Sequence, residues 1–238
     1  MKKETKTQPE AQGISRSDFL RGAATAGVAL TLAPVLLAPR RALAQATGVR
    51  YAMVIDLRKC VGCYSCQVTC KEENDVPIGK FRSWVKYHET GSFPEVSRTF
   101  MPYLCNHCER PSCVAACPVE ATYKREDGVV LIDYDKCIRC ERCIAACPYD
   151  ARYIHPKRDA VDKCDFCEHR VAQGLVPACV QTCMGKARFF GDLNDPSGKV
   201  ARLVAANRDR IQTLLPETGN GPQVYYIPED NKPALPNK

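Results

Sequence analysis

The chain has few of the side chains on which enzyme active sites depend. Among its 238 residues are four histidines and one tryptophan, and aromatic residues make up 8%, so we do not expect a large apolar core to be its main source of stability. The sequence contains no recognisable Ser–His–Asp set, no glycine-rich loop of the kind that holds phosphates and no paired-carboxylate site. After residue 44, no apolar run reaches the length of a membrane-spanning helix. These absences argue against substrate chemistry by the chain itself.

Cysteine is the residue that the chain has in excess. Its sixteen cysteines all lie between residues 60 and 183, in four groups of four that each begin with the spacing C-x-x-C. Thiols crowded in this way are typical of shared metal sites. In chain order, the groups are Cys60, Cys63, Cys66 and Cys70 (group one); Cys105, Cys108, Cys113 and Cys117 (group two); Cys137, Cys140, Cys143 and Cys147 (group three); and Cys164, Cys167, Cys179 and Cys183 (group four).

Group three carries the most specific signal. Residues 137–148 read C-I-R-C-E-R-C-I-A-A-C-P, with gaps of two, two and three residues and then a proline. This run is the signature of bacterial ferredoxins, in which the fourth cysteine ligates the other cluster of a pair. The sequence therefore predicts [4Fe–4S] clusters and a partner motif elsewhere in the chain.

The groups are internal repeats. C-E-R-P-S-C-V-A-A-C-P (108–118) matches C-E-R-C-I-A-A-C-P (140–148) except for a two-residue insertion. The segments that lead into the groups are extended, and Asp127-Gly128 predicts the turn of a hairpin ahead of group three. We expect a short helix after each fourth cysteine. The predicted fold is α+β, with nested tandem ferredoxin-like two-cluster domains and loop insertions.

The residues around the fourth cysteines indicate which groups pair. Groups two and three end in A-A-C-P, whereas groups one and four lack the proline and end in T-C. Each group is then expected to lend its last cysteine to the cluster of its mate. The expected ligand sets are Cys60, Cys63 and Cys66 with Cys183; Cys164, Cys167 and Cys179 with Cys70; Cys105, Cys108 and Cys113 with Cys147; and Cys137, Cys140 and Cys143 with Cys117.

This pairing nests one domain inside another. The outer domain comprises residues 50–98 plus 157–199, and the inner domain comprises residues 99–156. Residues 200–238 are expected to form a C-terminal helix and tail, in which apolar residues keep helical spacing as far as Leu215. Packing of this helix on its own domain is favoured over docking to a partner.

Residues 1–44 have the features of an export signal. The segment S-R-S-D-F-L-R (15–21) precedes a mildly apolar run, and cleavage after Ala44 would leave Gln45 as the first residue. The pattern resembles a twin-arginine signal, but Ser17 stands in place of the second arginine. Either this degenerate signal works alone or the chain crosses the membrane bound to a partner, and an uncleaved membrane anchor is the third option.

Two other uses of the cysteines compete with clusters. An even cysteine count in an exported protein ordinarily indicates disulfides, but two groups hold four thiols within eleven residues, which fits a shared metal core better. The spacing C-x2-C…C-x3-C of group four could instead hold one zinc ion. A zinc-stabilised structural protein is therefore the alternative of a different class.

No other side chain is assigned chemistry. The histidines are not needed as ligands because every group has four cysteines, and surface or supporting positions are expected for them. Three basic side chains beside group three are candidates for tuning cluster potentials, although a solvated surface position is favoured. The histidines are His88, His107, His155 and His169, and the basic residues are Lys136, Arg139 and Arg142.

The formal net charge of +7 is weak evidence for a nucleic-acid partner. Of this excess, +4 lies in residues 1–44, and the rest of the chain carries +3. Four clusters with their thiolates, at about −2 each, would bring that remainder to roughly −5. The basic residues are therefore expected to offset cofactor charge, and no nucleic-acid partner is predicted.

The chain resembles the four-cluster iron–sulfur subunits of the molybdopterin oxidoreductases related to dimethyl sulfoxide reductase. The resemblance spans about residues 50–227 and rests on the cysteine groups together with L-C-N-H-C (104–108), A-C-P-Y-D-A-R-Y-I (146–154) and D-K-C-D-F-C-E-H-R (162–170). Cys140 stands where the iron–sulfur subunits of respiratory nitrate reductases have a tryptophan and a three-iron cluster. The resemblance therefore implies four [4Fe–4S] clusters.

The resemblance also implies an electron-transfer subunit and not an enzyme. In such complexes, clusters pass single electrons between a quinol-oxidising integral membrane subunit and a molybdopterin-containing catalytic subunit. Membrane association would be indirect, through the partner, on the periplasmic side after export of the folded chain. The segments 51–60 and 125–130 are most similar to the tetrathionate reductase branch, and polysulfide or thiosulfate reductase and nitrite-reduction complexes stay open.

Overall fold

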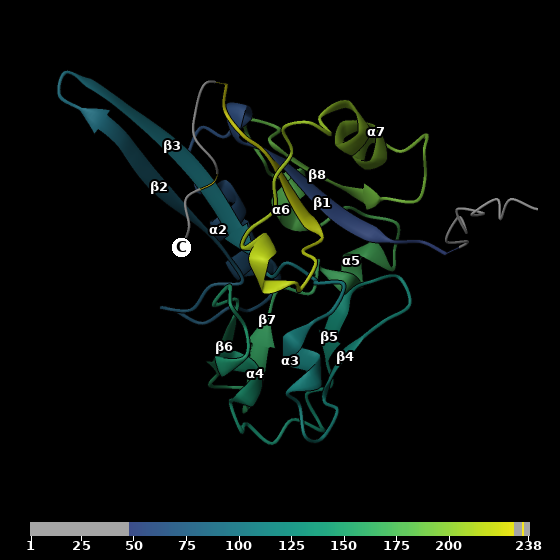
Figure 1. Ribbon diagram of the computed structural model, residues 1–238. Helices are drawn as coiled ribbons and strands as arrows, with labels where there is room; N and C mark the ends of the chain where they lie inside the picture. Colours follow the sequence, from purple (N-terminus) through teal and green to yellow (C-terminus); the bar gives the residue numbers. More distant parts are fainter. Residues whose placement is uncertain (1–47, 231–234, 236–238) are drawn as a thin grey trace, which may run out of the picture. The chain divides into compact units, whose positions relative to one another are not determined.

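The computed structural model describes residues 48–230 and residue 235, which lie within one compact unit, Ala46–Lys238. The expected leader, residues 1–44, lies outside the described residues. Short helices and short strands are mixed along the chain, as expected of an α+β fold (Figure 1). The strands are β1 (Tyr51–Asp56), β2 (Ser83–Ser92), β3 (Glu95–Leu104), β4 (Thr122–Lys124), β5 (Val130–Ile132), β6 (Arg152–His155), β7 (Ala160–Lys163), β8 (Arg188–Asp192) and β9 (Val224–Ile227). The helices are α2 (Ser65–Glu73), α3 (Ser112–Ala115), α4 (Arg142–Ala145), α5 (Glu168–Val171), α6 (Ala178–Gln181) and α7 (Lys199–Ala206), with 3-10 turns η2 (Leu57–Lys59) and η3 (Pro216–Thr218).

β1 is the central strand of a three-stranded sheet of order β8–β1–β9. It pairs antiparallel with β8 and parallel with β9, so the first and last strands of the described chain lie side by side (Figure 1). Because successive side chains of a strand point to opposite faces, β1 serves two apolar clusters. Ala52 and Val54 pack with residues of α7, whereas Met53 and Ile55 pack with Tyr226 in the larger cluster.

Three two-stranded hairpins complete the strands: β2–β3, β4–β5 and β6–β7. The β2–β3 hairpin reaches away from the rest of the fold (Figure 1), and near its base Trp84 stacks on Tyr103 with ring centroids 5.7 Å apart. The predicted turn at Asp127-Gly128 joins β4 to β5, where Gly128 has φ +85°. A left-handed residue at this turn favours glycine, which explains why the signal could be read from the sequence.

The position of the short helices corrects one prediction. They were expected after each fourth cysteine, but α3, α4 and α6 each carry the third cysteine and end before the fourth. α2 carries both the third and the fourth cysteine of group one. Side chains in a helix point back toward its N-terminus, so this placement directs the third sulfur toward the C-x-x-C loop that precedes it. After the fourth cysteine of groups two to four, the chain turns into β4, β6 and β8.

The C-terminal helix is shorter than its apolar spacing predicts. α7 ends at Ala206 because Asn207 caps it, donating its side-chain amide to the Leu203 carbonyl oxygen at 2.8 Å. Ile211 lies beyond the helix but packs in the same cluster as Val200, so the segment covers its own domain. None of the helices in the described ranges is long and apolar enough to cross a bilayer.

Much of the larger core cluster consists of cysteines, with Cys66, Cys105, Cys108, Cys164 and Cys179 all buried in it. The fold therefore wraps its small apolar core around thiols. The expected borders between the inner and outer domains cross continuous structure, since the border after residue 98 falls within β3 and the one after residue 156 falls in the turn between β6 and β7.

Candidate metal centres

The sixteen thiols lie in four sets, each with three members from one group and a fourth from another. Cys183 lines one small cavity with all three first cysteines of group one, and Cys117 lines another with those of group three. In the remaining sets, Cys108 interacts electrostatically with Cys147, and Cys164 with Cys70. We call them set 1 (Cys60, Cys63, Cys66, Cys183), set 2 (Cys70, Cys164, Cys167, Cys179), set 3 (Cys105, Cys108, Cys113, Cys147) and set 4 (Cys117, Cys137, Cys140, Cys143).

The four C-x-x-C loops share one backbone feature. The residue before the second cysteine has positive φ in each: Gly62 (64°), His107 (42°), Arg139 (55°) and Phe166 (58°). Left-handed residues in such loops form concave nests whose backbone N–H groups attract anions, a feature of many iron–sulfur sites. At Gly62 the close approach of another ring favours glycine as well, because a Cβ there would lie 2.4 Å from the Phe100 ring.

Burial raises the pKa of eight of the sixteen thiols and so keeps these eight neutral when no metal is bound. Desolvation, with the neighbouring thiols of set 3, raises the pKa of Cys108 to about 12, and desolvation raises the pKa of Cys179 to about 11. Thiols of this kind are poor nucleophiles, and they ionise when a metal ion takes the place of the proton. The sets are therefore suited to hold metal and not to attack a substrate.

Two buried arginines lie against the sulfurs. Arg188 is 3% exposed, and its hydrogen-bond partners are sulfur atoms and one hydroxyl, none of them a carboxylate. Burial alone would lower the pKa of Arg188, but the Cys179 and Cys66 sulfurs, when charged as thiolates, outweigh that effect and raise it. An unpaired buried cation costs several kcal/mol, roughly, unless negative charge lies nearby. Neutral thiols do not supply that charge, whereas an anionic iron–sulfur group bound by thiolates does.

Buried hydrogen-bond donors beside set 3 also indicate a bound iron–sulfur group. The side-chain amide of Asn106, next to Cys105, and Nε of Arg152 are buried without a hydrogen-bond partner. A buried N–H without an acceptor costs about 1–3 kcal/mol. Sulfide and thiolate sulfurs accept hydrogen bonds from such donors in iron–sulfur proteins. The donor set, the charge and these N–H groups therefore all fit [4Fe–4S] clusters.

The sets follow one another in a series. Arg188 bonds to sulfurs of sets 1 and 2, and the electrostatic partners of Arg152 include Cys113 of set 3 and Cys143 of set 4. Between sets 2 and 3, the ring of His107 stacks on Phe166 at a centroid distance of 3.7 Å. Of the sixteen cysteines, the exposed ones belong to the two end sets; they are Cys63 in set 1 and Cys140 in set 4.

Comparison with known proteins identifies the family. Residues 96–193 match the model of the 4Fe-4S dicluster domain. The chain is 45% identical to the B subunit of tetrathionate reductase from Salmonella typhimurium, over 79% of this chain and 76% of that protein. It is 43% identical to the iron-sulfur B subunit of a putative dimethyl sulfoxide reductase from Halobacterium salinarum (79% and 82%) and 44% identical to the B subunit of tetrathionate reductase from Archaeoglobus fulgidus (76% and 83%).

The chain is an iron–sulfur subunit of the dimethyl sulfoxide reductase family. The predicted [4Fe–4S] cofactors, the electron-transfer role and the absence of a catalytic role are confirmed by this membership. It is one subunit of a multi-subunit oxidoreductase, with a catalytic partner. The disulfide alternative is wrong, since all sixteen cysteines are free. The cluster domain spans group four, which was the candidate for zinc.

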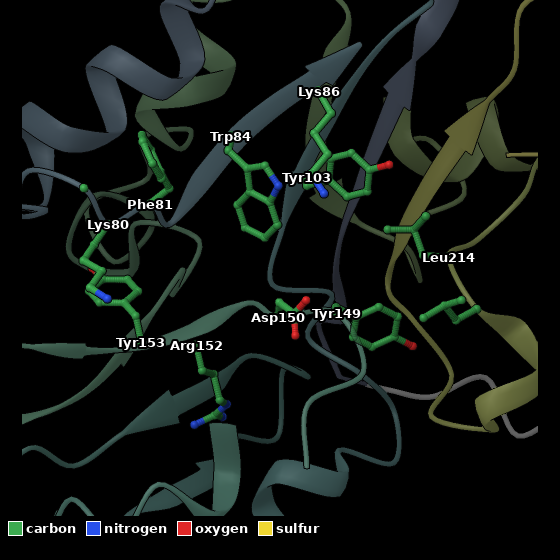
Figure 2. A pocket seen from close by; sticks show the side chains of 12 residues that line it. Lys80, Phe81, Trp84, Lys86, Tyr103, Tyr149, Asp150, Arg152, Tyr153 and Leu214 are labelled. Carbon is green, nitrogen blue, oxygen red and sulfur yellow. The ribbon is translucent and has the colours of Figure 1, made fainter. Parts of the chain in front are cut away.

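A cavity of about 240 Å³ opens beside set 3 of this iron–sulfur subunit. Figure 2 shows Trp84 and Tyr103 on one side of it and Tyr149 and Arg152 on another. The Tyr149 hydroxyl hydrogen-bonds the Cys108 sulfur, and Arg152 Nη2 lies 3.0 Å from the sulfur of Cys113. The cavity wall is thus in direct contact with the thiols of set 3.

Three basic residues considered as tuners from the sequence lie on the surface near set 4. Lys136, Arg139 and Arg142 are exposed, and Arg139 pairs with Asp159. Water and salt screen exposed charges strongly, so the solvated role favoured for these residues agrees with the structure.

The four histidines differ in burial. His107 and His155 are fully buried, His88 is half-buried and His169 is exposed.

Sequence reasoning missed Arg152 and Arg188, the two basic residues that do contact the thiols. A signal was present, because each follows the fourth cysteine of its group by five residues in the pattern C-x-x-x-A-R.

Across the described residues, no three Cys, His, Asp or Glu side chains gather as a group that could hold one lone metal ion.

Proposed function

We propose that this subunit carries four [4Fe–4S] clusters between a quinol-oxidising integral membrane subunit and a molybdopterin-containing catalytic subunit of an exported respiratory reductase. The observation that carries the proposal is the series of four thiol sets with exposed cysteines at its two ends only. When bound, each cluster supplies one-electron transfer. A sheltered interior with accessible ends suits transfer from one partner to another.

In this proposal each set of four thiols holds one cluster. Three ligands come from a single loop and its helix, and the fourth is lent by the paired group, so sets 1 and 2 exchange Cys70 and Cys183 while sets 3 and 4 exchange Cys117 and Cys147. The support is the grouping of these thiols in space together with the left-handed loop residues described above. Residues 50–98 with 157–199 would then form the outer unit, around the inner unit of residues 99–156.

The protein part has two tasks. It holds the sets at fixed separations through packed elements, and it excludes water from the inner sets, where Cys164, Cys167, Cys105 and Cys108 are all buried. Low solvent access and fixed hydrogen bonds set the potentials of such centres. The residues that line the four thiol sets therefore tune the reduction potentials of the clusters. The catalytic partner subunit recognises the substrate.

We propose tetrathionate as the substrate of the complex. The support is the 45% and 44% identity to the B subunits of two tetrathionate reductases over most of the chain. The alternative is the same role in a polysulfide or thiosulfate reductase or in a nitrite-reduction complex. Purified native complex should reduce tetrathionate with a viologen donor faster than thiosulfate, polysulfide or nitrite. A higher rate with one of the others would assign the chain to that branch.

We further propose a location on the periplasmic side of the cytoplasmic membrane, reached by export in folded form. The support is the sequence pattern of residues 1–44 and the cluster cofactors, which must be inserted before the chain crosses. Membrane association would then come through the partner. N-terminal sequencing of the mature protein should begin at Gln45; a chain that begins at Met1 would contradict cleavage.

Metal analysis tests the cofactor count. The protein, purified anaerobically, should contain about sixteen iron atoms and about sixteen acid-labile sulfides per chain, four of each for each cluster. About eight of each would halve the number of clusters and refute the four-set assignment. Zinc without sulfide would refute the proposal as a whole.

The crossed ligands have a separate test with a matched pair of variants. Cys183→Ser should alter the spectrum and potential of the set 1 cluster and leave the set 2 cluster intact. Cys70→Ser should do the reverse, because it belongs to group one by sequence but to set 2 in space. If Cys183→Ser disturbed only the cluster bound by Cys164 and Cys167, the crossover would be wrong.

A further inference from the structure

Two buried arginines occupy equivalent places in the repeat. Arg152 and Arg188 each stand five residues after the fourth cysteine of their group, and each is the first residue of a strand, β6 or β8. Each also follows, by two positions, a non-glycine residue with positive φ: Asp150 at 50° and Lys186 at 49°. The same turn therefore delivers an arginine to the same place in both halves of the repeat.

Arg188 lies between sets 1 and 2. Its Nη2 is 3.4 Å from the sulfur of Cys66 in set 1, and its Nη1 is 3.7 Å from the sulfur of Cys179 in set 2. The Ser83 hydroxyl, 3.0 Å from Nη2, holds the guanidinium from β2. The side chain is thus fixed by groups from separate parts of the chain and cannot turn toward solvent.

Arg152 has the corresponding position between sets 3 and 4. Its Nη2 is 3.0 Å from the sulfur of Cys113, which packs in one buried cluster with Cys143 of set 4. A hydroxyl again holds the other end, since Nη1 is 3.1 Å from Oγ1 of Thr122. Thr122 is itself the residue five positions after Cys117, so in group two a hydroxyl replaces the arginine of the pattern.

We propose that Arg188 and Arg152 are matched tuning residues, one for each pair of clusters, and that each raises the reduction potentials of the two clusters between which it lies. The proposal rests on the proposed function, since it needs clusters in the four sets. Reduction adds one negative charge to a cluster, and a fixed cation stabilises the reduced form more than the oxidised form. N–H donation to the ligand sulfur acts in the same direction.

Burial explains why these two arginines raise the reduction potentials of the clusters and the surface arginines do not. Arg188 and Arg152 are 3% and 5% exposed, so little water lies between their charges and the sulfurs. Interactions between charges are several times stronger in a protein interior than in water. Arg142 is exposed on α4 next to Cys143, and its charge is screened by solvent and salt. Arg142 therefore provides a control of equal charge and neighbouring position.

The test is a potentiometric titration of the purified native complex, followed by electron paramagnetic resonance. The variants are Arg188→Met, Arg188→Lys, Arg152→Met, Arg152→Lys and the control Arg142→Met. Arg188→Met should lower the potentials of two of the four clusters, and Arg152→Met should lower those of the other two. At a fixed potential the ratio of reduced to oxidised cluster should fall about tenfold for a shifted cluster, which corresponds to 59 mV for one electron.

The lysine variants separate charge from shape. Arg188→Lys and Arg152→Lys keep the charge, so they should restore most of the lost potential, and Arg142→Met should leave all four clusters unchanged. Unmoved potentials in the methionine variants with full iron content would overturn the proposal. So would equal loss of iron from the methionine and lysine variants, which would show a role in shape alone. A wild-type complex without about sixteen irons per chain would instead refute the proposed function.

Discussion

Replacing Asp162 with asparagine should lower the melting temperature of the protein by about 6–12 °C, because it removes the anion from a buried ion-pair network. Asp162 Oδ1 lies 2.7 Å from Nη2 of Arg82, and the two side chains are 0% and 2% exposed. The hydroxyls of Tyr153 and Tyr134 donate to the same carboxylate at 2.7 and 2.9 Å. Burial alone would raise the pKa of Asp162, but Arg82 and these hydrogen bonds outweigh that and lower it, so the group is charged at neutral pH.

The magnitude follows from the partner that is left behind. Removing one member of a buried ion pair costs about 3–5 kcal/mol, since the other charge stays buried and unpaired. Here Asp165 Oδ2 also lies 2.9 Å from Arg82 Nη1, which leaves part of the compensation in place. We therefore take the lower limit, about 3 kcal/mol. For a domain of this size each kcal/mol lowers the melting temperature by about 2–4 °C.

The effect should extend to the metal centres. Arg82 also donates to Asn74 at 2.9 Å, and the Asn74 amide lies 3.7 Å from the sulfurs of both Cys70 and Cys167. Loosening Arg82 should therefore bleach the set 2 cluster at a lower temperature than in the wild type. Anaerobic melting is followed by circular dichroism and by cluster absorbance at one scan rate.

Two variants control the measurement. Glu89→Gln breaks the ion pair with Arg98, whose side chains are about half exposed, and should leave the melting temperature almost unchanged. Arg82→Met added to Asp162→Asn should cost less than the sum of the single changes, because the pair is coupled. Wild-type melting of Asp162→Asn with full iron content, or an equal fall in Glu89→Gln, would refute the reasoning.

Two further changes have defined outcomes. Gly62→Ala should lower the free energy of unfolding by about 2–4 kcal/mol in a denaturant titration, because the alanine would have positive φ and would displace the Phe100 ring. The control is Gly79→Ala, which should lower it by only about 1 kcal/mol, since no atom lies within 4 Å of a Cβ at that position. Equal costs would contradict the steric argument. Tyr149→Phe removes a hydrogen bond to the Cys108 sulfur and should lower the potential of the set 3 cluster by roughly 40 mV, the equivalent of about 1 kcal/mol, in the same titration that follows the arginine variants. A shift in any other cluster would show that the hydroxyl acts elsewhere.

The cysteine spacing carried most of what could be predicted about the site. Metal-binding thiols must be presented by short loops of fixed length, so the groups are visible as local patterns. The grouping in space of Cys183 with group one and of Cys117 with group three is that expected from the residues around each fourth cysteine. Both signals are local to the ligands themselves.

Features that depend on contacts between residues far apart in the sequence could not be predicted from local patterns. β9 lies parallel to β1 although about 170 residues separate them, and no local pattern in Val224–Ile227 specifies that neighbour. The burial of Arg152 and Arg188 is another case, since an arginine beside a cysteine group has the same sequence appearance whether it is exposed or enclosed. The end of α7 at Ala206 depended on one capping side chain, Asn207, against an apolar spacing that continued.

The nesting of the thiol sets has a consequence for biosynthesis. A ribosome releases the chain from its N-terminus, so sets 3 and 4 have all their cysteines once residue 147 has emerged, whereas set 1 must wait for Cys183. β1 waits longer still, since one of its two neighbours is Val224–Ile227. Sets 3 and 4 can therefore be completed on a nascent chain before sets 1 and 2. A chain cut short before residue 183 lacks the fourth cysteine of set 1.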